Sequence, residues 1–240
     1  AFAFNLGKLS NTNHLNTTLL VQDYIHGIEY SVNTVTHLGK HYISDIGCWE
    51  LAHINGKSMF YKCFISPHYA FDPKIGAVVL RALDAINVQS GPNNFDVIVP
   101  FNKSESPVVI EMNRRSGHTL DFAAMEKAFG TNQLEMTANG ILNMWNSQHA
   151  PSANAISNCD QTRVGAPSQA AKFYAIFFIY PNKNGVLKSF NMELVMTRIS
   201  SYFSSHWFHT IGSTVSKNVN KYVDAIVLMH FVHENEKILR

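Results

Sequence analysis

The chain contains the stretch GPNNFDVIVPFNKSESPVVIEMNRRSGH, residues 91–118, and this stretch decides the fold. Within it, residues 93–100 and 108–112 are rich in β-branched and aromatic side chains, which favour strands. A polar loop, NKSES, separates the two runs. Strands joined by so local a connection pair as antiparallel neighbours. The stretch therefore predicts a strand pair with a polar loop at one end.

Polar side chains lie where these two predicted strands can face each other. Asp96 lies on the first strand, and Glu111 and Asn113 end the second. Residues i and i+2 of a strand share a face, so Glu111 and Asn113 point the same way, and Asp96 can fall opposite them. Two carboxylates and an amide oxygen form an oxygen-only set that suits magnesium. Ordinary polar ends of surface strands are an equally compatible interpretation.

Arg115 extends the same pattern by two residues beyond Asn113. If the backbone stays extended, Arg115 shares the face of the predicted metal ligands, and Arg114 points away. A guanidinium in that position can reach a phosphoryl group during its transfer. Arg115 is therefore the candidate catalytic residue.

A second group of candidates lies upstream, where a predicted strand ends in a short bend. The backbone N–H and C=O groups of such a bend can contact a planar base, and the amide of Gln22 could read an exocyclic amine. Glu29, on the return strand, can accept hydrogen bonds from ribose hydroxyls. A plain hairpin with Glu29 in solvent is the competing interpretation. The candidate base-binding residues are Gln22, Asp23, Tyr24 and Ile25.

The other predicted elements give an α+β fold, an antiparallel sheet with flanking helices. Hairpin-joined strands come first, and runs of strands then alternate with helices without regular βαβ units. Further strands are predicted at residues 19–24, 29–37, 41–51, 58–66, 173–180 and 222–231. Helices are predicted at residues 73–87, 120–129 and 133–145, with a short one near Glu193.

The predicted domain organisation has three parts. Residues 1–150 hold both groups of candidate residues. Residues 151–171 are rich in Ser, Asn, Pro and Ala and read as a linker or loop. Residues 172–240 form a small α/β appendage.

Composition limits the classes of partner. Charged residues make up 15% of the chain, against a usual share of about a quarter, and 46% are hydrophobic, which argues against disorder. The net charge of +2 comes without a basic stripe, so neither nucleic acid nor a membrane surface is predicted as a partner. Three widely spaced cysteines suggest a reducing compartment, and we expect a cytoplasmic protein.

The two groups of candidate residues occur together and in order, and each resembles a motif of the ATP-grasp superfamily. LVQDYIHGIEYSVNTV, residues 20–35, resembles the hinge, and residues 91–118 resemble the metal-binding strand pair. The branch it most resembles is the carboxylate–amine ligases that include L-amino-acid ligases. The resemblance covers residues 19–142, and residues after 172 match the appended subdomain of that branch loosely. Asn94 and His118 depart from the pattern, which commonly has histidine and glycine there.

The resemblance implies an ATP-dependent, ADP-forming ligase of small-molecule carboxylates and amines, acting through an acyl-phosphate. The enzymes it resembles place an N-terminal domain and a lysine-bearing lobe before the hinge, so we expect this chain to be the C-terminal lobe and inactive alone. The alternative is a non-catalytic nucleotide-binding or interaction module with the same fold. Residues implied for ATP are Gln22, Asp23, Tyr24, Ile25 and Glu29, for magnesium or manganese Asp96, Glu111 and Asn113, and for the phosphoryl group Arg115.

Overall fold

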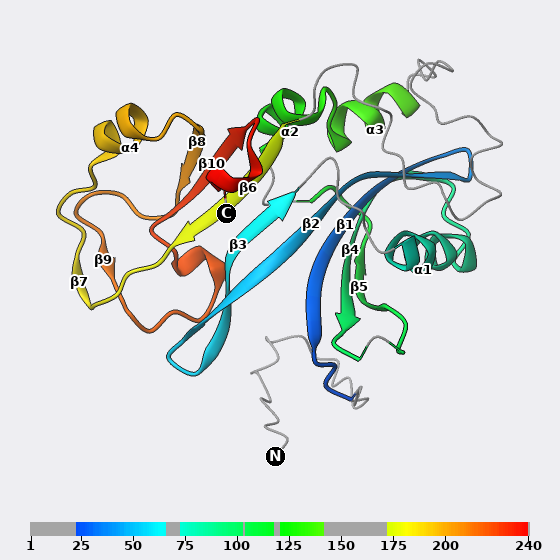
Figure 1. The fold of residues 1–240 in the computed structure, drawn as a ribbon, viewed down its shortest axis with the longest axis horizontal. Helices are drawn as coiled ribbons and strands as arrows, with labels where there is room; N and C mark the ends of the chain where they lie inside the picture. Colours follow the sequence, from blue (N-terminus) through cyan, green and yellow to red (C-terminus); the bar gives the residue numbers. More distant parts are fainter. Residues whose placement is uncertain (1–22, 66–72, 103, 118–120, 142–171, 240) are drawn as a thin grey trace, which may run out of the picture.

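A computed structural model describes residues 23–65, 73–102, 104–117, 121–141 and 172–239. Its main feature is a sheet of eight strands in the order β5-β4-β1-β2-β3-β6-β10-β8, in which every pair of neighbours is antiparallel (Figure 1). The strands are β1 (Gly27–His37), β2 (Lys40–Ile54), β3 (Lys57–Ile65), β4 (Ser90–Pro100), β5 (Val108–Asn113), β6 (Phe173–Ile179), β8 (Tyr202–Trp207) and β10 (Val227–His233).

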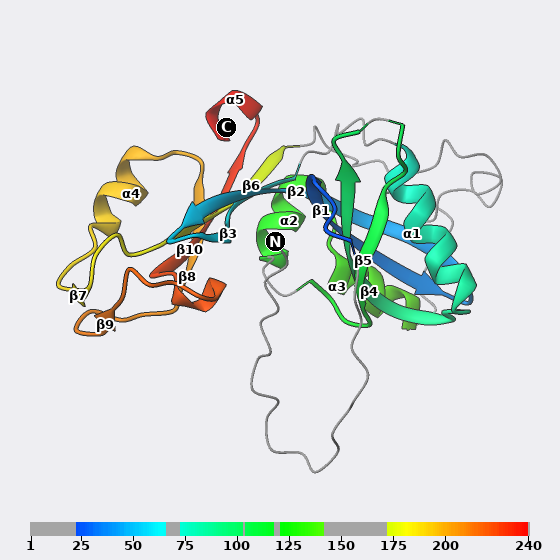
Figure 2. The same ribbon diagram turned by 90° about the horizontal axis from the view of Figure 1, so that it is seen from below.

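Helices cover both faces of this sheet (Figure 2). α1 (Pro73–Ala85) buries Ile75, Val79 and Leu83 against Val32 and other side chains of one face. α2 (Phe122–Phe129) packs on Cys63, Ile65 and Ile176 of the other face. α3 (Gln133–Ile141) also lies against β1 and β4. Since Ser31 and Asn33 alternate with Val32 along β1, they face away from α1.

The residues after 171 continue the same sheet. β6 pairs with β3, and β10 and β8 follow, so the sheet passes without interruption from the N-terminal to the C-terminal part of the described chain. The remaining elements are β7 (Gly185–Val186) paired with β9 (Thr214–Val215), the helices α4 (Met192–Arg198) and α5 (Glu236–Leu239), and the 3-10 turn Tyr222–Asp224. The predicted linker, residues 151–171, lies outside the described residues, and the three-part division stays a prediction.

The predicted antiparallel sheet with flanking helices is confirmed, with three corrections to its elements. Residues 23–26 are not in a strand, and β1 begins at Gly27. The last strand begins at Val227 and not at residue 222, because Asp224 accepts hydrogen bonds from the backbone of Asn220 and Lys221 and closes a turn there. β8 was not predicted, since its two central serines interrupt the apolar pattern.

None of the described helices is long and apolar enough to cross a membrane.

Candidate active site

Two rows of side chains cross four strands on the face opposite α1. In the first row, Gly47, Ser31, Asp96 and Glu111 are successive partners on β2, β1, β4 and β5. In the second row, the partners are Asp45, Asn33, Asn94 and Asn113. Residues directly opposite each other in antiparallel strands project to the same side. Strand register therefore brings Asp96, Glu111 and Asn113 onto one surface.

Negative charge accumulates in the first row. The pKa of Asp96 is raised by burial and by the neighbouring Glu111 carboxylate, while Arg115 lowers it. The pKa of Glu29, two residues before Ser31 on the same face of β1, is raised to about 7 by burial and by Asp96. Carboxylates whose pKa rises because they repel one another would gain from a bound cation. The electrostatics of this row suit a cation site.

The second row is a buried chain of hydrogen bonds. The Asn94 side-chain amide donates to Asn33 Oδ1 at 3.1 Å, and Asn33 Nδ2 donates to Asp45 Oδ1 at 2.7 Å. Ser44 Oγ donates to the other Asp45 oxygen at 2.8 Å. Burial raises the pKa of Asp45 to about 6, although both hydrogen bonds work in the opposite direction. These hydrogen bonds fix the side chains of the second row beside the carboxylates of the first row.

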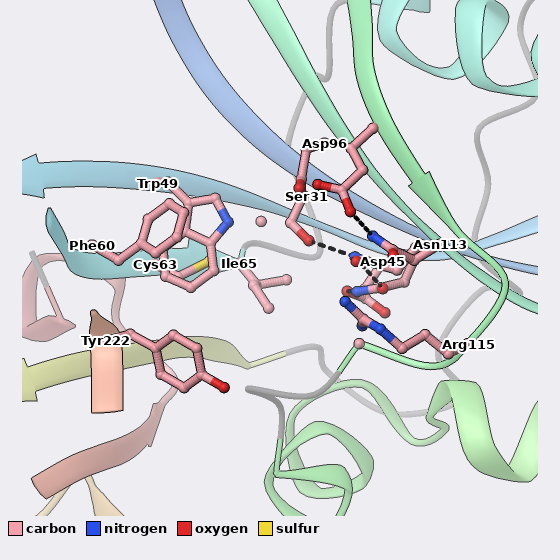
Figure 3. Close-up of a pocket in the computed structure, with 15 residues that line it drawn as sticks. Ser31, Asp45, Trp49, Phe60, Cys63, Ile65, Asp96, Asn113, Arg115 and Tyr222 are labelled. Atoms are coloured by element: carbon pink, nitrogen blue, oxygen red, sulfur yellow. Dashed lines mark hydrogen bonds between the residues drawn. The ribbon is translucent and has the colours of Figure 1, made fainter. Parts of the chain in front are cut away.

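Arg115 reaches the same site from a bend after β5. Its side chain lines the pocket together with Asp96, Glu111 and Asn113, and its Nη1 donates to the Ser116 carbonyl oxygen at 3.0 Å (Figure 3). Arg114 has a different partner, since its Nη2 donates to the Ser90 carbonyl oxygen at 3.1 Å. The two arginines therefore take different directions.

A buried glutamine anchors the segment that carries Arg115. Gln133, at the start of α3, is fully buried. Its Nε2 donates to the carbonyl oxygens of Thr34 and Asn93, both at 2.9 Å, and its Oε1 accepts from the Gly117 backbone N–H at 3.0 Å. One side chain thus ties the bend at residues 114–117 to β1 and β4.

The pocket has a polar and an aromatic half. Its volume is about 190 Å³. Figure 3 shows Asp96, Asn113 and Arg115 on one side, and Trp49, Phe60 and Tyr222 on the other. Gly47 lies in the floor between them, where a Cβ atom would stand only 2.5 Å from Cys63 Sγ. The missing side chain at Gly47 therefore lets Cys63 of β3 approach β2 closely.

The predicted ATP-binding residues are only partly described. Gln22 lies outside the described residues. Asp23, Tyr24 and Ile25 precede β1 and do not line the pocket, whereas Glu29 lies close enough to Asp96 for the two charges to interact. The roles assigned to all of these residues stay predictions.

The donor set fits a hard divalent cation. Asp96 and Glu111 offer carboxylate oxygens, and Asn113 lies beside them, with its Nδ2 donating to Glu111 Oε1 at 2.8 Å. Its Oδ1 is the atom that could join the carboxylates around a cation. Magnesium typically takes one or two carboxylates and completes its shell with water and phosphate. Across the described ranges, no three His, Cys, Asp or Glu side chains gather as a metal-binding group.

Sequence reasoning missed the second row and the aromatic half. Ser31 and Asn33 continue the alternation that begins at Glu29, and this period of two was the available signal. Phe60 and Cys63 both line the pocket despite their odd spacing, because a register shift in β3 leaves Tyr61 without a partner on β2. Tyr222 comes from a turn far along the chain, and no local pattern indicates its position.

No family model matches the chain, and no curated protein sequence matches it. Solved structures do resemble it. L-amino acid ligase from Bacillus licheniformis has a TM-score of 0.68 at 15% identity, over 89% of this chain and 48% of that one. Phosphoribosylglycinamide synthetase from Anaerococcus prevotii has a TM-score of 0.62 at 15% identity, over 90% and 50%. N5-carboxyaminoimidazole ribonucleotide synthetase from Thermus thermophilus has a TM-score of 0.54 at 15% identity, over 91% and 49%.

These three proteins are ATP-grasp enzymes, and the chain spans about half the length of each. The sequence identities are low, so the likeness concerns the fold. The described residues have the ATP-grasp fold.

Proposed function

We propose that this chain is the C-terminal part of an ATP-dependent, ADP-forming ligase that joins a small carboxylate to an amine through an acyl-phosphate. One observation carries the proposal: Asp96, Glu111, Asn113 and Arg115 line one pocket on an ATP-grasp sheet. Oxygen ligands beside a fixed guanidinium are the groups that phosphoryl transfer needs. The likeness to a protein named as an L-amino acid ligase supports the choice of substrates.

The proposed reaction has two steps. A carboxylate oxygen of the first substrate attacks the γ-phosphorus of ATP, the bond from that phosphorus to the bridging oxygen breaks, and ADP leaves with the electron pair. The amine nitrogen of the second substrate then attacks the acyl carbon, the bond from that carbon to the phosphate oxygen breaks, and inorganic phosphate leaves. The nitrogen releases one proton, and an amide remains.

The proposed roles follow from what each side chain can do. Asp96, Glu111 and Asn113 would hold magnesium or manganese, which supplies positive charge to the phosphate oxygens. Arg115 would donate to the phosphoryl oxygens as charge develops on them, because a guanidinium presents a planar fork of donors. Glu29 would accept hydrogen bonds from the ribose hydroxyls. Adenine would lie against the segment Gln22, Asp23, Tyr24 and Ile25.

The proposed cellular compartment is the cytoplasm. An ATP-dependent ligase with three widely spaced cysteines fits the reducing, ATP-rich cytoplasm.

The test is acid-dependent ADP formation by the native protein that contains this chain. Purified protein receives ATP, magnesium and a panel of carboxylic acids, with hydroxylamine as the trapping amine, and ADP and hydroxamate are quantified. We expect both products, and their loss in Asp96→Asn. Glu105→Gln is the control, because Glu105 is an exposed carboxylate that contacts Asn102 in the β4–β5 loop. ATP binding without ADP formation from any acid would favour the non-catalytic module instead.

A further inference from the structure

The residues of the aromatic half of the pocket have no role in the two reaction steps proposed above. Trp49, Phe60 and Tyr222 line it together with Cys63 and Ile65. Among the described lining residues, the charged side chains Asp45, Asp96 and Arg115 lie in the polar half (Figure 3). Glu111, the fourth, is the strand partner of Asp96. A ligand that fills both halves must therefore carry a charged or polar group at one end and an apolar group at the other.

The aromatic walls are held in place from behind. The Trp49 and Phe60 ring centroids are 4.6 Å apart, and Trp49 also packs on Phe178 at 6.2 Å. Tyr222 packs edge-to-face on Phe178 at 6.4 Å and on Phe208 at 6.0 Å. These neighbours belong to the cluster beneath α2. Rings fixed in this way present a preformed apolar surface, which binds apolar groups with little loss of side-chain entropy.

The size of the pocket limits the ligand. Pockets for drug-sized molecules typically hold about 300–1,000 Å³, whereas this one measures about 190 Å³. A volume below that range suits an acid of amino-acid size. Gly47 and Cys63 line the same pocket between the two halves, so one ligand can contact both halves.

From this geometry we infer that the aromatic half holds the side chain of the carboxylate substrate, which is an acid with an aromatic or bulky apolar side chain. The inference rests on the proposed function, since that function places the reacting carboxylate beside Arg115 and Asp96. The side chain then points across Gly47, toward Trp49, Phe60 and Tyr222. These three residues determine substrate specificity, and they touch the substrate without touching the reacting atoms.

The test compares two acids that differ by one phenyl ring. Binding of 3-phenylpropionate and of propionate to the native protein is measured by calorimetry, in the presence of magnesium and a non-hydrolysable ATP analogue. We expect 3-phenylpropionate to bind at least tenfold more tightly. Trp49→Ala and Phe60→Ala should each weaken its binding at least fivefold and leave propionate binding unchanged. Trp49→Leu keeps an apolar side chain against Phe178 and serves if the alanine variant fails to fold.

Tyr61→Ala is the matched control. Tyr61 is the neighbour of Phe60, but it is 43% exposed and packs edge-to-face on Phe177 at 6.2 Å, outside the pocket lining. We expect Tyr61→Ala to bind both acids like the unmodified protein. Equal binding of the two acids, or an equal loss in Tyr61→Ala and Phe60→Ala, would overturn the inference. Displacement of 3-phenylpropionate by adenosine would also overturn it, because the aromatic half would then be a base site.

This design separates the two proposals. Selective binding of 3-phenylpropionate without ADP formation from any acid would contradict the proposed ligase activity and leave the binding specificity standing. ADP formation that is equally fast with propionate and with 3-phenylpropionate would support the ligase and contradict the specificity.

Discussion

Asp96 of β4 and Glu111 of β5 are direct partners across an antiparallel pair, so their carboxylates project from the same face of the sheet. Burial and the Glu111 charge together raise the pKa of Asp96. Asp96 is half-buried and Glu111 is exposed, and two carboxylates held side by side destabilise the fold unless a cation or a proton compensates them. The thermal stability of the protein should therefore respond to divalent cations that bind at this pair.

Magnesium is therefore expected to raise the unfolding temperature of the chain. At ten times its dissociation constant a ligand adds about 1.4 kcal/mol, or roughly 3–6 °C for a protein of this size. Asp96→Asn should abolish the magnesium response and should not lower the unfolding temperature in magnesium-free buffer, because it removes a repulsion. Thermal unfolding followed over a magnesium titration measures both effects. Glu105→Gln is the reference variant. If magnesium raised the unfolding temperature of Asp96→Asn as much as that of Glu105→Gln, the cation would bind elsewhere.

Arg115→Ala is expected to lower kcat in the native protein by about 100- to 1000-fold, roughly 3–4 kcal/mol, with a smaller change in KM for ATP. The reason is that its proposed contact would strengthen as charge develops on the transferring phosphoryl group. Arg114→Ala is the internal control, since Arg114 donates to the Ser90 carbonyl oxygen instead of lining the pocket. Steady-state kinetics on both variants decides. Greater damage from Arg114→Ala would reverse the assignment of the two side chains.

Gln133→Ala is expected to lower the free energy of unfolding by at least about 2 kcal/mol. The substitution leaves the buried carbonyl oxygens of Thr34 and Asn93 and the N–H of Gly117 without the partner that they have now. It also frees the segment that carries Arg115, so kcat should fall as well. Urea unfolding measures the first effect. Leu134→Ala, an exposed neighbour on the same helix, should change the free energy of unfolding by less than about 0.5 kcal/mol.

The polar half of the pocket was largely predictable from the sequence. The period of two in a strand placed Glu111 and Asn113 on one face, and a local strand pair placed Asp96 opposite them. Arg115 followed from the same alternation, although β5 ends at Asn113 and a bend, rather than a strand, carries the guanidinium into the pocket.

The rest of the pocket depends on register and on contacts between distant elements. Asn33 meets Asp45 only through the pairing of β1 with β2, which contains its own irregularity at Asn33 and Thr34. The register shift beside Tyr61 turns Phe60 inward, against simple alternation. Gln133 reaches back 99 residues to Thr34 from the first turn of a helix. The period of two along β1 was the local signal for Asn33, whereas local sequence carries none for Phe60 or Gln133, because packing between elements decides their positions.

Asp45→Asn is expected to change how stability depends on pH. Burial raises the pKa of Asp45 to about 6, from 3.8. When the pKa of a group is higher in the folded than in the unfolded state, its stabilising contribution is fully present below the unfolded pKa. That contribution is lost as pH rises to the folded pKa, here from about 4 to 6. The unmodified protein should therefore lose stability as pH rises across this window, whereas Asp45→Asn should not. The free energy of unfolding of the variant, relative to that of the unmodified protein, should rise by up to about 3 kcal/mol. Urea unfolding at a series of pH values measures the difference. A difference that shrinks as pH rises would contradict the raised pKa.

The central claim is that the Asp96–Glu111 face supports transfer of a phosphoryl group from ATP to a carboxylate. The most direct measurement supplies the native protein with ATP, magnesium, an amine and 3-phenylpropionate whose carboxylate oxygens are ¹⁸O, and analyses the released phosphate by mass spectrometry. An acyl-phosphate passes one carboxylate oxygen to phosphorus, so we predict inorganic phosphate with a single ¹⁸O atom, formed together with ADP. Turnover that yields amide with unlabelled phosphate, or with AMP in place of ADP, would contradict the account.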